Sequence, residues 1–446
     1  MDAFNTTPST LPTDRGRTSL RNLPALALDP LACIRAAWRR QGDLFWLDCL
    51  LTKVLVVVEP GAADHVLRTN QRNYQRSPLF SRPLRSVTGP TMFNTDGDEW
   101  LPRRRTVQPA FSRALVRTLA PKVVAAVDRQ LAELPTEVEF ESAPAMARMA
   151  MAMIGSTMFD AELTDDDLVE AFAHSRAVSE RRVNVPVWLP SAVPSPENRR
   201  LARTRALIEG RIGAMIDRRA AGQERDDLLD RLMAAKDPET GCPFARATLI
   251  AEAALLVNAG HDTTAAALTC ALHYIGSEPQ WQARLRDEID RELGGEAPSP
   301  EPLARCTLLR QVMRETLRLH PPAWVSVHRQ AVADDRILGE HVPAGTTVLV
   351  ATSLLHRHPR YWDRPNAFDP ERFAPEREAE RPRGVYFPFG MGRRRCIGEP
   401  LAWLELEAAV ARVLQRYELE APRGGLREKA GFTLEPTRAP LTLRPR

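Results

Sequence analysis

The segment most informative about the fold is Phe389-Gly390-Met391-Gly392-Arg393-Arg394-Arg395-Cys396-Ile397-Gly398. It surrounds one cysteine with three glycines, and glycine is useful where a backbone turns sharply or approaches a flat ligand closely. Residues 401–409 then have helical character, so Cys396 lies just before a helix N-terminus. Backbone N–H groups and the helix dipole favour a thiolate over a thiol at that position. Arg394, two residues earlier, can hold an anionic group.

This stretch resembles the cysteine loop of the cytochrome P-450 superfamily, which reads Phe-x-x-Gly-x-Arg-x-Cys-x-Gly. The matching positions are Phe389, Gly392, Arg394, Cys396, Gly398 and, for the alanine that usually follows, Ala402. The resemblance implies that Cys396 is the axial ligand of a haem iron, with Gly398 beside it among the haem-binding positions. It also implies that Phe389 packs against the haem and that Arg394 pairs with a propionate. A thiolate ligand pushes electron density onto the iron and favours O–O cleavage.

A second informative stretch is Ala259-Gly260-His261-Asp262-Thr263-Thr264. It lies in an apolar run over residues 248–275, which predicts one helix of about 40 Å at ~1.5 Å per residue. Threonine can bond back to helix carbonyls and glycine weakens the ladder, so the helix can open locally beside a ligand. The stretch resembles the oxygen-binding groove of the family. That implies Ala259 at the haem, Thr263 as a hydrogen-bond partner of dioxygen and Asp262 as a proton relay. We assign no role to His261.

Two further segments complete the predicted haem site. Trp100 and Arg104 are four residues apart, so both can reach one carboxylate from a single helical turn. They resemble the propionate-binding helix of the family. His328-Arg329 resembles the strand segment that supplies another propionate contact, and Arg329 is our candidate for it. An ordinary surface arginine is the alternative in each case.

The segment Glu315-Thr316-Leu317-Arg318 places opposite charges three residues apart on one helix face. That spacing means little by itself, because the chain repeats it elsewhere. The helix stop at Pro321-Pro322 and the later Arg372 give it weight. Together they resemble the family's buried network of one glutamate and two arginines, which implies a structural brace behind the haem and no catalytic role.

The pattern along the chain predicts a mainly α protein with a minor β portion. Residues 1–25 are rich in Thr, Ser, Pro and Arg and are expected to be a flexible lead-in. No repeat or clear linker divides residues 26–446, which we expect to form a single catalytic domain with the cytochrome P-450 fold. The resemblance places the haem between the long central helix and the cysteine-loop helix. Helical periodicity recurs in residues 62–69, 115–133, 201–220 and 279–293. The strand-like segments are residues 44–58, 346–351 and 441–443, and a turn near 51–53 divides the first of them.

Composition argues against several other classes. The 446 residues carry a net charge of +4, which is weak for a nucleic-acid partner. No two of the six cysteines form a C-x-x-C pair, so a zinc ribbon, an iron–sulfur cluster and a disulfide framework are all disfavoured. The polar N-terminus lacks the features of a signal peptide, and no early apolar run reaches the roughly 20 residues that span a bilayer. We expect a cytoplasmic monomer with no membrane anchor.

The resemblance predicts a monooxygenase that inserts one oxygen atom from dioxygen into a small hydrophobic substrate, by hydroxylation or epoxidation. Its cofactor would be haem b (iron protoporphyrin IX). Only residues 397–446 follow Cys396, too few for a reductase domain. We therefore expect electrons from a separate ferredoxin and ferredoxin reductase. In the family the docking face surrounds the cysteine. On this docking face, the candidate residues for contact with an acidic partner are Arg393 and Arg395, and further candidates are Arg103 and Arg105.

By analogy with the family, we expect the substrate pocket to be lined by residues 79–93, 172–192, 255–259, 323–327 and 431–434. Their apolar side chains predict a hydrophobic substrate, and a pocket for any small molecule would show the same.

Four alternative functions stay open on the sequence alone. A peroxygenase of this fold often lacks the Asp-Thr pair and would turn over with peroxide. A haem enzyme that isomerises, couples or dehydrates would incorporate no labelled oxygen. A non-catalytic haem sensor would not need the pair, so Thr263→Ala would not uncouple oxygen consumption. A metal-free cysteine hydrolase would need a histidine base near Cys396.

Overall fold

A computed structural model describes residues 29–49, 52–163, 165–184 and 188–446. The predicted lead-in at residues 1–25 lies outside the described residues, as does residue 51 of the turn predicted near 51–53. The described part is mainly helical with small sheets, which confirms the predicted fold class. It clusters into two compact units, which are described separately below. The single catalytic domain over residues 26–446 stays a prediction.

Unit 1 combines the described residues up to Phe80 with Ala323–Ala367 and Glu380–Arg395, and it contains a five-stranded sheet. Its five strands have the order β1-β2-β8-β5-β3, with β2 and β8 parallel and the other pairs antiparallel. Apolar side chains of the sheet pack with those of α3 to form a core. The strands are β1 (Leu44–Cys49), β2 (Thr52–Val57), β3 (Tyr74–Arg76), β5 (Arg329–Ala331), β8 (Thr347–Val350) and the separate pair β6 (Asp335–Ile337) and β7 (Glu340–Val342).

The helices of unit 1 are short. The predicted helix at residues 62–69 begins at Pro60, where Glu59 accepts a hydrogen bond from the Ala62 N–H group, and it continues as a π-helix. These helices are α2 (Pro30–Gln41), α3 (Pro60–Asp64), η1 (His65–Thr69), η2 (Gln71–Asn73), α16 (Thr352–Leu355) and η5 (Gly392–Arg394). Helix α4 (Pro78–Thr88) carries the chain from unit 1 into unit 2.

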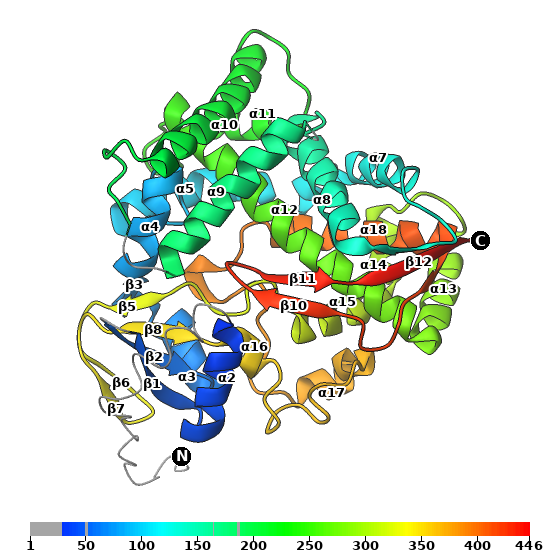
Figure 1. The fold of residues 1–446 in the computed structure, drawn as a ribbon. Coiled ribbons are helices and arrows are strands. Elements are labelled where there is room, and N and C mark those ends of the chain that lie inside the picture. Colours follow the sequence, from blue (N-terminus) through cyan, green and yellow to red (C-terminus); the bar gives the residue numbers. More distant parts are fainter. Residues whose placement is uncertain (1–28, 50–51, 164, 185–187) are drawn as a thin grey trace. The chain divides into compact units, whose positions relative to one another are not determined.

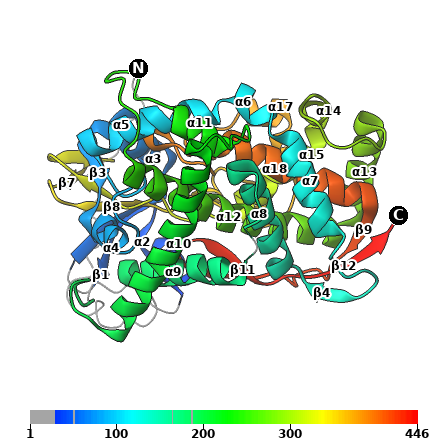
Figure 2. The ribbon, with the colours of Figure 1, turned by 90° about the horizontal axis from the view of Figure 1, so that it is seen from above.

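Unit 2 combines Ser81–Pro322, Phe368–Ala379 and Cys396–Arg446. Helix α12 runs through it and packs against α8, α10, α15 and α18 (Figure 1). Figure 2 shows α9 and α10 side by side in the same unit. The helices are α5 (Gly97–Val107), η3 (Gln108–Phe111), α6 (Arg113–Arg117), α7 (Ala120–Leu131), α8 (Ser142–Phe159), α9 (Asp166–Asn184), α10 (Pro196–Ala220), α11 (Leu228–Ala234), α12 (Arg246–Ser277), α13 (Pro279–Leu293), α14 (Pro300–Arg305), α15 (Thr307–Leu319), η4 (Pro370–Phe373), α17 (Pro375–Ala379) and α18 (Glu399–Arg416).

The strands of unit 2 form a three-stranded sheet and a hairpin. The sheet has the order β4-β12-β9, and the β10–β11 hairpin lies against α12 (Figure 1). The pairing of β10 with β11 shifts register between Arg427 and Glu428. These strands are β4 (Glu139–Glu141), β9 (Tyr417–Glu420), β10 (Arg427–Ala430), β11 (Leu434–Arg438) and β12 (Pro440–Pro445). Within the described ranges, no helix is both long and apolar enough to cross a membrane.

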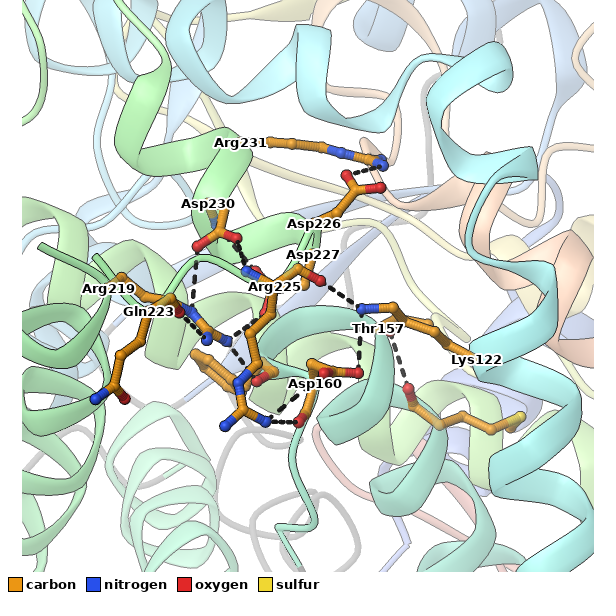
Figure 3. A network of polar contacts seen from close by, with 12 residues as sticks. Lys122, Thr157, Asp160, Arg219, Gln223, Arg225, Asp226, Asp227, Asp230 and Arg231 are labelled. Carbon is orange, nitrogen blue, oxygen red and sulfur yellow. Dashed lines mark hydrogen bonds and ion pairs between the residues drawn. The ribbon is translucent and has the colours of Figure 1, made fainter. Parts of the chain in front are cut away.

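A polar network fastens the helices on one side of unit 2 (Figure 3). Arg219 on α10 pairs with Asp227, the N-cap of α11, at 2.5 Å, and with Asp230 at 3.2 Å. Lys122 on α7 pairs at 3.1 Å with Asp160, which ends α8 in a left-handed conformation. Burial raises the pKa of Asp227 despite the nearby Arg219. We read the network as structural, because its charges pair with one another.

Candidate active site

Cys396 lies directly before α18, as the sequence predicts. The backbone N–H groups of Gly398 and Glu399 form hydrogen bonds to its thiol, and Arg104 lies near enough to act on it electrostatically. Burial outweighs these effects and raises the pKa of Cys396. Its side chain is nevertheless exposed to solvent. Many protein atoms surround the thiol, although solvent reaches it.

The turn before Cys396 depends on glycine, and it belongs to unit 1. Gly390 and Gly392 have φ angles of +73° and +68°, in the left-handed region that favours glycine. A Cβ atom at Gly392 would lie 2.0 Å from the Leu67 carbonyl oxygen, so only glycine fits there. The predicted haem contacts Phe389 and Arg394 lie on this tightly packed turn.

The central helix bears an accessible face of small residues. Ala259 is exposed, although residues 264–273 of the same helix are all buried. The Thr263 hydroxyl donates to the Ala259 carbonyl at 2.8 Å. Helix α12 is continuous through this point, so the predicted local opening of the helix is absent. The threonine bonds to its own helix without breaking the ladder, an arrangement that threonine allows.

Asp262 is held from two sides. Its carboxylate lies 2.9 Å from Nδ1 of His261 and 3.1 Å from Nε of Arg176 on α9. The Nε2 atom of His261 lies 3.0 Å from the Ala147 carbonyl oxygen. Both ring nitrogens of His261 therefore lie against oxygen atoms, which orients the ring. Arg176 also pairs with Glu435 on β11. No sequence motif indicates this role of His261 or the contact from Arg176.

Helix α5 presents Trp100 and Arg104 as predicted, one turn apart. Trp100 is buried. The Nε atom of Arg104 donates to Gln108 at 3.1 Å, and no carboxylate among the described residues pairs with Arg104. The pKa of Arg104 is lowered, because burial outweighs the opposing effect of the nearby Cys396. A half-buried cation without an acidic partner suits an anionic ligand group.

The prediction that Arg103 and Arg105 face a partner protein is wrong. Arg103 pairs with the buried Glu252 at 2.8 Å, and Arg105 pairs with Asp237 at 3.0 Å and with Glu239. Both arginine side chains are therefore used inside unit 2. An arginine triplet cannot reveal acids that arrive from more than 100 positions away in the sequence.

In unit 1 the predicted Arg329 lies on β5, directly opposite Arg76 on β3. Both residues are buried, at 6% and 7% exposure. Like charges directly opposite each other on neighbouring strands destabilise a sheet, and an anion beside them would relieve that repulsion. Burial, together with Arg76, lowers the pKa of the adjacent His328 to about 4. Arg76 was not predicted, because no sequence motif surrounds it.

The predicted brace of Glu315, Arg318 and Arg372 is confirmed. Arg318 donates to both carboxylate oxygens of Glu315 at 2.6 and 2.8 Å, and Arg372 donates at 3.3 Å. The backbone N–H of Asp369 adds a bond at 2.9 Å. All three charged side chains are buried. The network fixes the segment around η4 to α15 within unit 2.

Glu405 is a further buried acid, and no sequence motif predicts its burial. Glu405 on α18 is 2% exposed, and Thr264 on α12 donates to it at 3.3 Å. Burial raises its pKa to about 8. A glutamate within an apolar helical run was the only available signal, and helical runs often expose such a residue.

Several residues of unit 2 fit a haem. They are the accessible Cys396 thiol at a helix N-terminus, the guanidinium of Arg104, which has no carboxylate partner among the described residues, and the face of small residues on α12. A thiol for iron, an arginine for a propionate and an apolar wall are groups that a haem-thiolate protein uses.

Comparison with known proteins supports this class. The family model for cytochrome P-450 matches residues 24–441. The chain is 30% identical over 403 residues to cyclooctat-9-en-7-ol 5-monooxygenase of Streptomyces melanosporofaciens, covering 87% of each chain. It is 30% identical to cyclooctatin synthase of the same organism, over 94% of this chain and 92% of the relative. It is 27% identical to pentalenene oxygenase of Streptomyces avermitilis, over 85% and 84%.

The fold and the site thus define a haem-thiolate oxygenase. The chain belongs to the cytochrome P-450 family. It is a monooxygenase that uses haem-thiolate iron and dioxygen and that requires a redox partner and an organic substrate.

Proposed function

We propose that Cys396 is the axial ligand of the haem and that the enzyme oxidises a small, hydrophobic, ring-containing substrate. The observation that carries the first part is the accessible Cys396 thiol, which receives N–H groups from Gly398 and Glu399 at the start of α18. When bound, the haem-thiolate group supplies oxidation by dioxygen with two external electrons and two protons. The chain's own residues bind the group, shape the pocket and move protons.

The arginines divide the task of holding the propionates. Arg104, supported by Trp100 on α5, is one propionate contact of this proposal, and Arg329 and Arg394 are the others. Arg76 joins this set because it lies opposite Arg329. Phe389, Gly398 and Ala259 supply flat packing surfaces.

Asp262 and Thr263 handle the protons. Asp262 relays a proton between solvent and the pocket, oriented by Arg176 and His261. The Thr263 hydroxyl lies on the accessible face of α12 and can exchange its bond to Ala259 for one to dioxygen. Thr263→Ala is expected to consume oxygen without forming product in proportion, whereas a sensor would show no such change.

The contacts of the predicted pocket segments and the names of the relatives support the proposed substrate class. Phe93 and Phe432 lie with ring centroids 6.0 Å apart within unit 2, which gives the predicted pocket segments an aromatic wall. The predicted pocket positions 185–187 lie outside the described residues. Two relatives are named for acting on cyclooctat-9-en-7-ol and pentalenene, both unsaturated carbon skeletons. We therefore favour a cyclic terpene or its alcohol, attacked by hydroxylation or epoxidation.

The native electron donor in this proposal is a ferredoxin with its reductase, as the sequence predicts. The exposed Arg393 and Arg395 next to Cys396 support an acidic docking partner. A cytoplasmic setting agrees with the five free cysteines among the described residues. The monomeric state remains a prediction.

The test of the ligand is a carbon-monoxide difference spectrum of the reduced, haem-loaded protein. A strongly red-shifted Soret band in the wild type, lost in Cys396→Ser and kept in the buried-cysteine control Cys306→Ser, would support the assignment. A red-shifted band that survives Cys396→Ser would contradict it. Incorporation of one labelled oxygen atom from dioxygen into a cyclic terpene would then test the substrate class.

A further inference from the structure

Three potential metal ligands converge in unit 2, away from the residues assigned to haem. They are Cys270 on α12, His320 directly after α15 and Glu428 on β10. One ligand atom of each, the sulfur, a ring nitrogen and a carboxylate oxygen, lies within 4.8 Å of the other two. Cys270 and His320 are 1% and 7% exposed. We propose that these three residues form a zinc site that fastens the β10–β11 hairpin to the helices.

The histidine is already oriented for coordination. Its Nε2 atom lies 2.8 Å from the Tyr274 hydroxyl, and its Nδ1 atom lies 2.6 Å from Oε1 of Glu428. Tyr274 is itself held by stacking on Phe368, with ring centroids 4.4 Å apart and planes inclined by 6°. Metal-binding histidines almost always use their second nitrogen for such a hydrogen bond, which fixes the ring and its tautomer. Nδ1 is therefore the coordinating atom.

The carboxylate comes from a hairpin with an irregular register. Between the pairs Arg427–Arg438 and Glu428–Pro436 one extra residue, Thr437, stands on β11. Glu428 on β10 lies against His320, with Oε1 at 2.6 Å from Nδ1. The hairpin tip beyond Glu428 carries Phe432 of the proposed pocket wall.

The donor set selects the metal. Thiolate, imidazole and carboxylate together suit zinc, whereas calcium and magnesium prefer oxygen donors alone. Zinc bonds of about 2.0–2.3 Å in a tetrahedron place the ligand atoms ~3.3–3.7 Å apart. The Nδ1–Oε1 separation of 2.6 Å widens to that range when zinc binds in this proposal. A water or the second Glu428 oxygen completes four-coordination, and Cys270 releases its proton to solvent.

The site lies apart from the oxygen chemistry but is connected to it. Cys270 follows Thr263 by seven residues, which is about two helical turns or ~10 Å along α12. Zinc would hold the hairpin base without contacting substrate. The three residues are 50 or more positions apart in the sequence, so no ligand-spacing motif announces them.

Zinc content of the haem-loaded enzyme, dialysed against zinc chloride, tests the proposal. We expect one zinc per chain in the wild type and in Cys306→Ser, whose cysteine is equally buried at 1% exposure. Cys270→Ser and Glu428→Gln should lose at least about ten-fold in zinc affinity, since each removes one of three ligands. The carbon-monoxide spectrum verifies that every variant is folded. Equal zinc binding by all four proteins, or by none, would overturn the site and leave an ordinary His320–Glu428 pair.

X-ray absorption at the zinc edge gives a second measure that does not depend on variants. One sulfur neighbour at about 2.3 Å with nitrogen and oxygen neighbours at about 2.0–2.1 Å is the expected result. A shell without sulfur would contradict the assignment of Cys270.

Discussion

Arg176 on α9 lies with its Nε atom 3.1 Å from Oδ2 of Asp262 on α12. The same guanidinium pairs with Glu435 on β11, so one cation serves two carboxylates. Burial raises the pKa of Glu435, with Asp262 adding to the rise and Arg176 opposing it. The orientation of Asp262 therefore depends on a helix and a hairpin that are distant in sequence.

The proton relay predicts a ranking of two variants. Asp262→Asn should lower product formation by about 10²-fold, because an amide cannot take up and release the proton. Arg176→Gln keeps the carboxylate and loses only its orientation, so its effect should be smaller. Initial rates in water and in heavy water measure both, and the solvent isotope effect should grow in Asp262→Asn. Equal rates and isotope effects in wild type and Asp262→Asn would exclude the relay.

Helix ends were predictable where the chain marks them. Residues 279–293 form α13 as expected, because Pro279 begins the helix and Gly294 ends it with a φ angle of +57°. The prediction of a single helix over residues 115–133 is wrong, because this segment forms two helices, α6 and α7. Pro121 explains the break, since proline lacks an N–H group and belongs in the first turn of a helix. The apolar periodicity continues across it and conceals the break.

Parts of the site were predictable when their residues lie in one segment. The positions of Cys396 before α18 and of Trp100 and Arg104 on one turn of α5 follow from local spacing. The roles of Arg76 and Arg176 and the partner of Arg103 were not predictable, because they arise from contacts between segments far apart in the chain. Neither a strand register nor an ion pair between distant helices leaves a local pattern.

Glu405 predicts an unusual pH dependence. Its pKa is raised to about 8, above the ordinary value of 4.5, so the folded state keeps a proton that the unfolded state loses. The free energy of unfolding therefore falls as pH rises between those values, by up to about 1.4 kcal/mol per pH unit. Glu405→Gln removes that slope. Relative to wild type, its stability should increase from about pH 5 to pH 8 and change little above.

Chemical unfolding of the two proteins at several pH values measures this difference. A constant difference across the range would show that Glu405 ionises normally in the folded protein. Glu301→Gln provides the control, because Glu301 is exposed and pairs with Arg117 at the surface.

The brace around Glu315 predicts a large loss of stability. Glu315→Gln leaves two buried guanidinium groups, Arg318 and Arg372, without their shared negative charge. Breaking a buried pair from one side costs about 3–5 kcal/mol, whereas an exposed pair such as that of Glu301 is worth about 0–1 kcal/mol. Urea unfolding followed by haem absorbance would compare the two. A loss in Glu315→Gln no greater than in Glu301→Gln would show that the network carries little stability.

The two arginine triplets should behave differently toward a redox partner. Charge reversal at Arg393 and Arg395 should slow reduction by ferredoxin at low ionic strength, about ten-fold or more, and added salt should reduce the difference because it screens exposed charges. Arg103→Gln instead removes the partner of Glu252, whose pKa is already raised by burial. That variant should lose stability by about 3–5 kcal/mol without a salt-dependent change in reduction. Stopped-flow reduction at two salt concentrations separates these effects. Unchanged reduction in the Arg393 and Arg395 variant would remove docking from this face, since Arg103 is already engaged inside unit 2.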